Sequence, residues 1–246
     1  MPGAKKNPIL NRPVTPDQIN QLLAALPRKE YQRLLPHLEP VELAFGAVLY
    51  EPHARIRHVY FPETCLVSLL TSVDENRVAE VGLVGFEGMV GVPVALGIAT
   101  SPFLAVVQGA GRALRMKTAD LNREFAASAT LQRELYCFTH LLMTQVAQTA
   151  ACNRFHVVTQ RMARWLLMTR DRVNSSEFRI TQEFLARMLG VRRVGITEAA
   201  GSLQRRKLIR YSRGTLTILD PKGLSAAACG CYQIVKDSYD HAHDHA

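Results

Sequence analysis

The sequence lacks the marks of a secreted, disulfide-bonded protein. Its 246 residues include five cysteines, an odd number without any C-x-x-C pair, so neither a disulfide framework nor a zinc ribbon is indicated. Two lysines near the N-terminus are followed by no apolar segment, which argues against a signal peptide. These absences fit a reducing compartment, and we expect a cytoplasmic protein.

A continuous apolar segment and catalytic motifs are also missing. Residues 88 to 111 carry no charge and are long enough to cross a bilayer, but Pro93, Pro102 and five glycines interrupt them. We therefore expect a folded sheet in this region and no membrane partner. There is no G-x-S-x-G, no H-E-x-x-H and no pair of carboxylates in a glycine-rich pocket. We expect no enzyme, no catalytic residue, no cofactor and no metal site.

Basic charge, by contrast, is abundant and concentrated. The formal net charge is +9 and the pI is about 9.6. Residues 154 to 223 hold fifteen Lys and Arg against five Asp and Glu, whereas the other 176 residues hold fifteen against sixteen. Because the excess lies in one segment, it indicates a polyanionic partner for that segment, with nucleic acid the leading candidate.

The same basic segment contains a pattern typical of a helix-turn-helix, QEFLARMLGVRRVGITEAAG, from Gln182 to Gly201. Small Ala186 falls where two helices must touch, and Gly190 falls where the chain must turn, since glycine tolerates a left-handed conformation. The expected inward positions are Leu185, Leu189, Val191, Ile196 and Ala199. An ordinary helical hairpin is the alternative, but the coincidence with the basic charge favours DNA binding.

Patterns elsewhere predict the remaining elements. Two short helices are expected between residues 17 and 38, broken at Pro27, followed by closely spaced short strands from Val41 to Met116 that are typical of a β-sandwich or barrel. Helical periodicity follows from Thr118 to Cys152 and again from Arg154 to Val173. A strand at 178 to 180 and a hairpin around Arg213-Gly214 flank the helix-turn-helix, and the tail from Ser225 looks weakly specified.

The helix ending at Cys152 carries residues at alternating spacings of four and three, the seam of a coiled coil. We expect this seam to form a homodimer interface, because helix-turn-helix proteins commonly bind two half-sites as dimers. One alternative is one long helix packed on its own domain. Another is a contact stripe that drifts past Leu142 onto Val146 and Ala150, as on a straight helix. Cys152 near the end of the seam could also form a redox-dependent crosslink with its mate. The predicted interface residues are Leu131, Leu135, Phe138, Leu142, Gln145, Thr149 and Cys152.

This layout resembles the Crp/Fnr transcription regulators over roughly residues 20 to 222. The sharpest matches are VTQRMARWLL from 158, ITQEFLARMLGV from 180 and SLQRRKLI from 202, and GFEGMVG from 85 resembles the phosphate-binding cassette. The resemblance implies an α+β fold. Its parts are a cyclic-nucleotide-binding-like β-roll (jelly-roll-like) sensor domain at 17–118, a dimerisation helix at 119–153, a winged helix-turn-helix domain at 154–223 and a C-terminal tail at 224–246.

By resemblance, the helix that begins near Arg192 lies in the major groove of double-stranded DNA. Arg193 aligns with a base-reading arginine of the family, while Val194 and Glu198 depart from the usual residues, so the operator should differ from that of the best-known members. Arg205, Arg206 and Lys207 are either a solvated face or phosphate contacts. The predicted DNA-binding residues are Thr181, Gln182, Arg192, Arg193, Thr197, Glu198, Arg213 and Thr215.

The sensor half departs from cyclic-nucleotide-binding members of the family. Val92 and Pro93 follow Gly91 in place of the ribose-binding glutamate, and no arginine lies between residues 78 and 111 to pair a cyclic phosphate. We therefore expect another small-molecule effector or none, rather than cyclic AMP. Weak candidate pocket residues are Gly88, Met89, Val90, Gly91 and Ser101.

Metal-based sensing finds little support. An iron-sulfur cluster of the family's type needs clustered N-terminal cysteines, and the first here is Cys65. Haem ligation by Cys65, His53 or His58 remains an alternative, and the terminal HAHDHA could collect a metal adventitiously. The expected function is a homodimeric transcription regulator that binds a pseudo-palindromic site, with RNA polymerase a candidate partner. An effector-independent architectural DNA-binding protein is the alternative. A redox role stays open for Cys65, Cys137, Cys152, Cys229 and Cys231.

Overall fold

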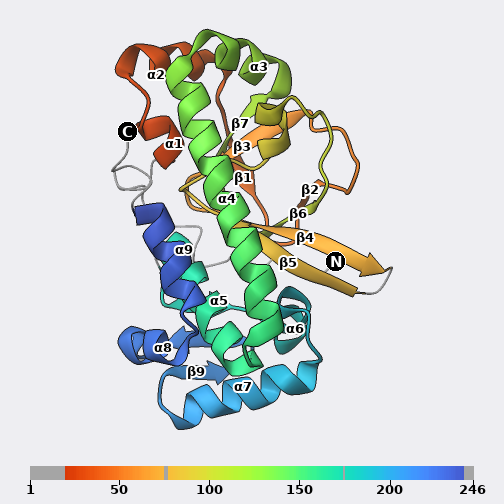
Figure 1. Ribbon diagram of the computed structural model, residues 1–246, viewed down its shortest axis with the longest axis vertical. Coiled ribbons are helices and arrows are strands. Elements are labelled where there is room, and N and C mark those ends of the chain that lie inside the picture. The colour runs from red at the N-terminus through yellow and green to blue at the C-terminus, as the bar shows by residue number, and fades with distance from the viewer. Residues whose placement is uncertain (1–19, 75–76, 174, 241–246) are drawn as a thin grey trace, which may run out of the picture. The chain divides into compact units, whose positions relative to one another are not determined.

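A computed structural model describes residues 20–74, 77–173 and 175–240 (Figure 1). The chain divides into two compact units, one of residues 1–68 and 84–136 and the other of residues 69–83 and 137–246. No helix in the described ranges is long and apolar enough to span a membrane. The terminal histidine-rich segment falls outside these ranges. The predicted domain bounds themselves stay predictions.

The first unit is built around a β-roll, as the sequence predicted. Its strands are β1 (Glu39–Leu43), β2 (Val48–Tyr50), β3 (His58–Pro62), the start of β4 (Leu66–Asp74), β6 (Leu104–Gly109) and β7 (Gly111–Lys117). One sheet has the order β1-β7-β3, and the other has the order β2-β6-β4-β5, where β5 is Arg77–Val84. Phe61, Leu66, Met89 and Met116 are fully buried in the core. The helices and sheets confirm the mixed helix and strand fold.

Two short N-terminal helices, α1 (Gln21–Ala24) and α2 (Arg28–Leu34), lead into a 3-10 turn at Leu35–His37. They part at Pro27, as predicted. Asn20 is fully buried, and its side chain accepts from the backbone N–H of Leu23 to cap α1. The same amide donates to the carbonyls of Pro62 and Gly88 at 3.0 and 2.8 Å, so one side chain joins α1, β3 and the GFEGMVG segment.

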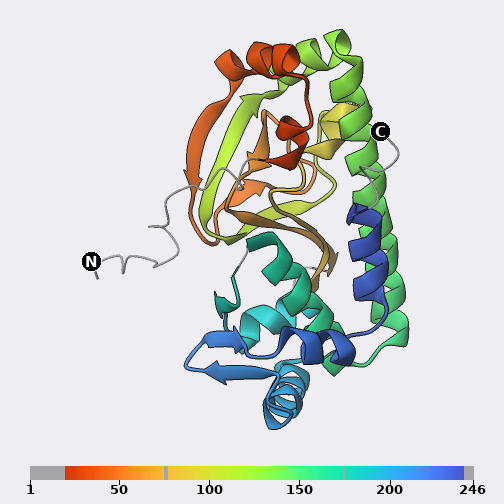
Figure 2. The same cartoon turned by 90° about the vertical axis from the view of Figure 1, so that its left-hand side faces the viewer.

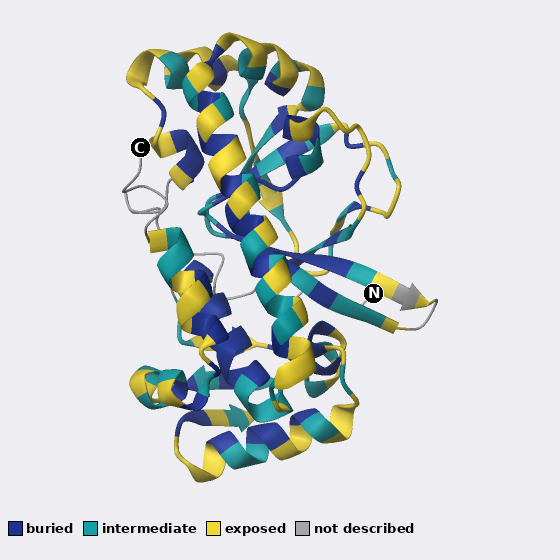
Figure 3. Ribbon diagram, viewed as in Figure 1, coloured by how far each residue is buried: buried dark blue, intermediate teal, exposed yellow. Residues whose placement is uncertain are grey.

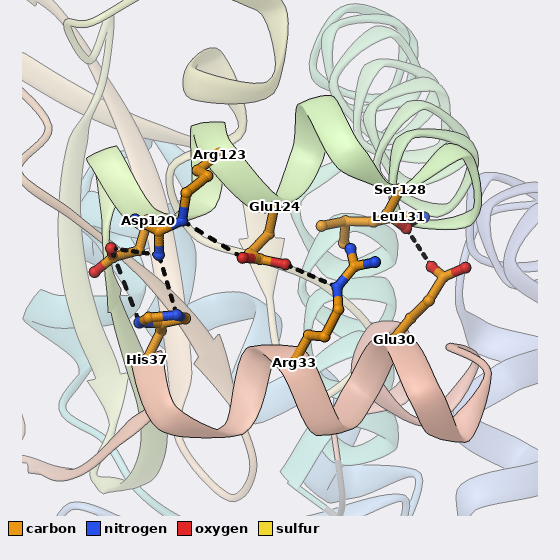
Figure 4. A network of polar contacts seen from close by, with 8 residues as sticks. All are labelled: Glu30, Arg33, His37, Asp120, Arg123, Glu124, Ser128 and Leu131. Carbon is orange, nitrogen blue, oxygen red and sulfur yellow. Dashed lines mark hydrogen bonds and ion pairs between the residues drawn. The ribbon is translucent and has the colours of Figure 1, made fainter.

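The helical region predicted from 119 to 153 consists of two helices, α3 (Thr118–Ala127) and α4 (Ala129–Phe155). Ser128 separates them in an extended conformation, and its hydroxyl accepts from the Leu131 N–H, which caps α4. A polar network ties α2 and the 3-10 turn to this junction (Figure 4). In it Glu30 accepts from Ser128, and Arg33 pairs with Glu124 at 3.2 Å.

The second unit holds α5 (Val158–Val173), β8 (Glu177–Arg179), α6 (Gln182–Leu189), α7 (Arg193–Arg205), β9 (Ile209–Ser212) and β10 (Thr215–Ile218). The three strands form a sheet of order β8-β10-β9 beside the helices (Figure 2). Leu166, Leu185, Ile196, Leu203 and Leu216 are fully buried and form the core of this winged helix-turn-helix. Helix α5 begins at Val158 rather than Arg154, because α4 continues to Phe155.

The segment after the wing is better specified than the sequence suggested. It forms α8 (Pro221–Ala227) and α9 (Cys231–Asp240). The carboxylate of Asp220 accepts from the Gly223 N–H and caps α8, with Pro221 at the first helical position. Leu224, Tyr232 and Val235 are buried, so both helices are held by apolar packing that the prediction of a weakly specified tail overlooked.

Candidate nucleic-acid interface

The turn between α6 and α7 has the geometry that its sequence predicted. Thr181 caps α6 by accepting from the Phe184 N–H at 3.1 Å. Gly190 ends the helix in the left-handed region at φ 60°, and the Val191 N–H bonds back to the Ala186 carbonyl at 2.9 Å. A Cβ at Gly190 would lie 3.2 Å from the Cβ of Ala79, so both conformation and space favour glycine.

The first turns of α7 present a polar face to solvent. Ile196 and Ala199 are buried, as predicted, and so are Leu185 and Leu189 on α6, whereas Val191 is half-buried. The predicted DNA-contacting residues of this helix are all exposed: Arg192, Arg193, Thr197 and Glu198. Val194, in place of the family's usual glutamate, is 60% exposed among them. An exposed apolar side chain directly after two arginines suits contact with a thymine methyl group.

Two of the predicted DNA contacts touch each other. The Thr197 hydroxyl on α7 donates to the Gln182 side-chain carbonyl on α6 at 2.8 Å. The N–H groups of the Gln182 side-chain amide are therefore available to donate to another group. This bond fixes the amide at the mouth of the turn, where a DNA phosphate would lie if α7 entered the major groove.

The wing is the predicted hairpin, with Arg213 and Gly214 both at positive φ, 50° and 78°. Such a pair forms the tight turn that suits the twist of two strands. Arg213 is exposed at this turn, and Thr215 begins β10. Tyr211, which sequence reasoning missed, anchors the wing through its hydroxyl, which donates to the Ile180 carbonyl at 2.7 Å. Burial raises the pKa of Tyr211, while the nearby charge of Arg193 acts to lower it.

Not all of the basic excess lies on the surface. Arg161, Arg164 and Arg172 on α5 are at least nine-tenths buried. Arg161 donates to the Leu189 carbonyl at the end of α6, and the guanidinium of Arg172 lies 5.2 Å from the centre of the Tyr239 ring. Charge counting from sequence therefore overstates the basic surface by three, because these arginines support the fold.

The predicted sensor-pocket residues Val90 and Ser101 form hydrogen bonds within the chain. Val90 and Tyr60 exchange two backbone hydrogen bonds of 2.8 and 3.0 Å, and the Ser101 hydroxyl donates to the Phe103 carbonyl. Gly91 has φ 108°, and a Cβ there would lie 2.9 Å from Val59. The cassette backbone thus packs directly on β3. A separate cleft in this unit is lined by the basic residues Arg55, Arg57, His58 and Lys117, together with Thr118 and Asn122.

The three candidate haem ligands lie in different surroundings from one another. Cys65 is fully buried, and burial raises the pKa of its thiol to about 12, which disfavours the thiolate that a metal needs. His53 is exposed, and His58 lines the basic cleft. Partial burial and the nearby Arg115 lower the pKa of His58.

The predicted dimer seam lies inside the chain. Leu131, Leu135, Phe138, Leu142, Gln145 and Cys152 are all buried. The Gln145 amide accepts from the Leu83 N–H at 2.8 Å and donates to the Leu83 carbonyl and to the Tyr239 hydroxyl. The Thr149 hydroxyl donates to the Gln145 carbonyl and accepts from Arg164. These side chains therefore pack on their own chain, which was the alternative interpretation, and are not available to a partner.

The opposite face of α4 is exposed and repeats the same spacing of four and three (Figure 3). Tyr136 is 50% and Met143 63% exposed, at the centre of this stripe. We call it the outer stripe; it consists of Ala129, Arg133, Tyr136, His140, Met143, Ala147, Ala150 and Arg154.

The geometry defines a class first: a winged helix-turn-helix domain, the type that places one helix in a DNA major groove, joined to a β-roll. Residues 160–227 match the Crp-like helix-turn-helix domain. The chain has a Crp-like helix-turn-helix domain and the fold of the Crp/Fnr transcription regulators. No curated protein matches its sequence.

Solved structures support the fold at low sequence identity. FixK2 from Bradyrhizobium japonicum is 12% identical with a TM-score of 0.67, covering 78% of this chain and 98% of its own. The regulator CLP from Xanthomonas campestris, described as responsive to c-di-GMP, is 17% identical with a TM-score of 0.64, covering 78% and 99%. A CRP-family transcriptional regulator from Thermus thermophilus is 18% identical with a TM-score of 0.64, covering 76% and 96%.

Proposed function

We propose that this protein is a sequence-specific, DNA-binding transcription regulator that acts as a homodimer in the cytoplasm. The observation that carries the proposal is the exposed polar face of α7, where Arg192 and Arg193 project from the first turn of a helix held by a buried core. Arginine suits this position because its planar fork matches O6 and N7 of guanine.

The neighbouring groups suit contacts to the DNA backbone. Thr181 and Gln182 lie at the N-terminal end of α6, where the helix dipole favours a phosphate. Arg213 and Thr215 lie at the wing turn and its second strand. Such contacts set the position of the protein on the duplex, whereas α7 supplies the sequence preference.

The second copy of the chain is proposed to pack on the outer stripe of α4. The stripe carries a coiled-coil spacing, with large side chains at Tyr136 and Met143 and small ones at Ala147 and Ala150 that allow close approach. The predicted helix is thus kept as the dimer element, but its partner-facing residues change. A twofold dimer would place two α7 helices on half-sites about 34 to 36 Å apart.

For control by a small molecule, the basic cleft of the first unit is the better candidate than the cassette backbone. Arg55, Arg57 and Lys117 are exposed there, which favours an anionic effector. An effector-independent architectural protein is the alternative. Footprinting of the same DNA with protein from which all small molecules have been removed separates the two, because an architectural protein would bind unchanged.

Footprinting of genomic fragments captured by the full chain tests the proposed function. We expect protection of two adjacent major grooves on one face of the duplex. The double variant Arg192→Ala with Arg193→Ala should lose this footprint while the folded structure is kept, since both side chains are exposed. Arg210→Ala on the outer side of β9 is the matched control and should keep it. Equal footprints from the double variant and the parent would refute the assignment of α7.

A further inference from the structure

Four metal-ligating side chains meet at the C-terminal end of α4, although the sequence scatters them. They are Cys152 in the last turn of α4, His156 just beyond it, Cys229 in the link between α8 and α9, and Cys231 at the start of α9. Their four ligand atoms all lie within 4.8 Å of one another, and the three cysteines are buried while His156 is half-buried. All four belong to the second unit.

We propose that these residues form a structural zinc site of the Cys₃His type. A tetrahedral Zn²⁺ with bonds of about 2.3 Å to sulfur separates its ligand atoms by about 3.8 Å. The structure places Cys152 Sγ 3.4 Å from Cys229 Sγ, and Cys231 Sγ 3.5 Å from His156 Nδ1. A shift of a few tenths of an ångström brings the sulfur pair to that separation. Because a zinc–nitrogen bond is shorter, about 2.0 to 2.1 Å, the sulfur–nitrogen separation expected is about 3.5 Å, which the Cys231–His156 pair already has.

Local structure places each ligand. Cys152 and His156 are four residues apart, and the His156 N–H bonds to the Cys152 carbonyl at 3.1 Å, so both side chains lie on one helical face. Cys229 and Cys231 flank Gly230, and the Tyr232 N–H bonds to the Cys229 carbonyl at 3.1 Å. The Tyr232 hydroxyl also donates to Asp171 on α5 at 2.8 Å, which holds the start of α9 in place.

The surroundings suit a site with net negative charge. Three thiolates and one Zn²⁺ carry a formal charge of −1, and the Gln148 amide donates to Cys231 Sγ at 3.0 Å, as a thiolate requires. Buried Arg161 and Arg164 line one cavity with Cys152. Among the described residues neither guanidinium forms an ion pair with a carboxylate, and the Nε atoms of both have no hydrogen-bond partner. The thiolates place negative charge beside these arginines, in addition to the buried carboxylate of Glu80, which lines the same cavity.

A multi-iron cluster fits this arrangement poorly, because several metal ions between the ligands would hold them farther apart than one ion does. Zinc is favoured over other divalent ions by three thiolates and one imidazole in a compact set. Its structural consequence is a link between α4 and α9, which lie side by side (Figures 1 and 2) and are also joined by the bond from Gln145 to Tyr239.

Metal analysis of the full chain, purified without a histidine tag and dialysed against a chelator, tests the site. We expect one zinc per chain. Cys229→Ser and His156→Ala should lose most of the metal, while Cys65→Ser and Cys137→Ser keep it. The triple variant His241→Ala, His243→Ala and His245→Ala should also keep it, which separates the site from adventitious binding by the terminal histidines.

A second measurement holds even if the cysteine variants misfold. Replacement of zinc by Co²⁺ in the unaltered protein should produce the intense visible bands of a tetrahedral ion and a thiolate charge-transfer band. His156→Cys should still bind Co²⁺, with a stronger charge-transfer band. The proposal is overturned if the unaltered protein takes up neither metal, if only the histidine-tail variant loses zinc, or if a Cys152–Cys229 disulfide forms in place of metal binding.

Discussion

The Thr197 hydroxyl on α7 donates a hydrogen bond of 2.8 Å to the side-chain carbonyl of Gln182 on α6. This contact links the first helix of the motif, which would contact phosphate, with the helix that would read bases. It also holds Gln182 with its amide nitrogen available to DNA. Under the proposed function, this exposed hydrogen bond would couple the positioning of the protein on DNA to base recognition.

The coupling predicts a non-additive effect on DNA affinity. Gln182→Ala and Thr197→Val should each weaken operator binding severalfold, because a net hydrogen bond is worth about 0.5 to 1.5 kcal/mol. In the double variant the second substitution should cost less than it does alone. Fluorescence anisotropy of the four proteins in a double-mutant cycle measures this. Strictly additive losses would mean that the bond has no role in binding.

Arg193→Ala should relax sequence preference rather than abolish binding. Loss of a bidentate contact to guanine costs about 1 to 3 kcal/mol of discrimination at one base pair in each half-site. Selection of binding sites by the variant from a random DNA pool should show that position degenerate and the others unchanged. Arg205→Ala, at the far end of α7, is the matched control. An unaltered consensus from Arg193→Ala would exclude this arginine as a base reader.

The wing arginine should contribute charge without sequence preference. Arg213→Asn removes the charge but suits the left-handed backbone at φ 50°, so the turn is preserved. Binding should weaken equally for specific and unrelated DNA, and the slope of log K against log salt should become shallower by about two per dimer. Titrations at several salt concentrations give this slope. An unchanged slope would place Arg213 away from the phosphates.

A buried contact offers a stability test in the second unit. The Nε1 of Trp165, the only tryptophan, donates to the buried carboxylate of Glu80 at 2.9 Å. Glu80→Ala should lower the free energy of unfolding by about 1 to 3 kcal/mol, since it leaves the indole N–H buried without its acceptor. Glu80→Gln, which keeps an acceptor, should cost less. Urea unfolding followed by Trp165 fluorescence compares them, and equal losses would argue against the hydrogen bond.

The dimer face can be tested by crosslinking. In a Cys137→Ser background, Met143→Cys should form an intermolecular disulfide on mild oxidation, because equivalent core positions of a parallel coiled coil approach closely. Ala226→Cys, exposed on α8, is the control and should remain monomeric on a non-reducing gel. If Met143→Cys does not crosslink while the protein sediments as a dimer, the partner lies elsewhere.

Local requirements made the DNA-binding end predictable from sequence. Gly190 must adopt positive φ, Ala186 must be small, and the wing alternates about Arg213-Gly214. These constraints act between residues close in the chain. The proposed dimer face was not predictable in the same way, because α4 carries two stripes with the same spacing on opposite faces. The more apolar stripe, with Leu135 and Phe138, packs inside the chain.

Long-range features escaped sequence reasoning for a related reason. Cys152 and Cys229 are 77 residues apart, and only folding brings the C-x-x-x-H at the end of α4 to the C-x-C that leads into α9. The buried arginines Arg161 and Arg164 counted as surface charge because a sequence shows charge but not burial. The cysteines that the sequence did not bring together and the arginines that it counted as surface charge are both buried in the second unit.

The central claim, that two α7 helices read DNA from a dimer built on α4, is tested most directly by selecting binding sites for the full chain from random DNA. We expect two inverted half-sites with centres about 34 to 36 Å apart, one turn of the duplex. A single unsymmetric site, or no sequence preference above unrelated DNA, would contradict it.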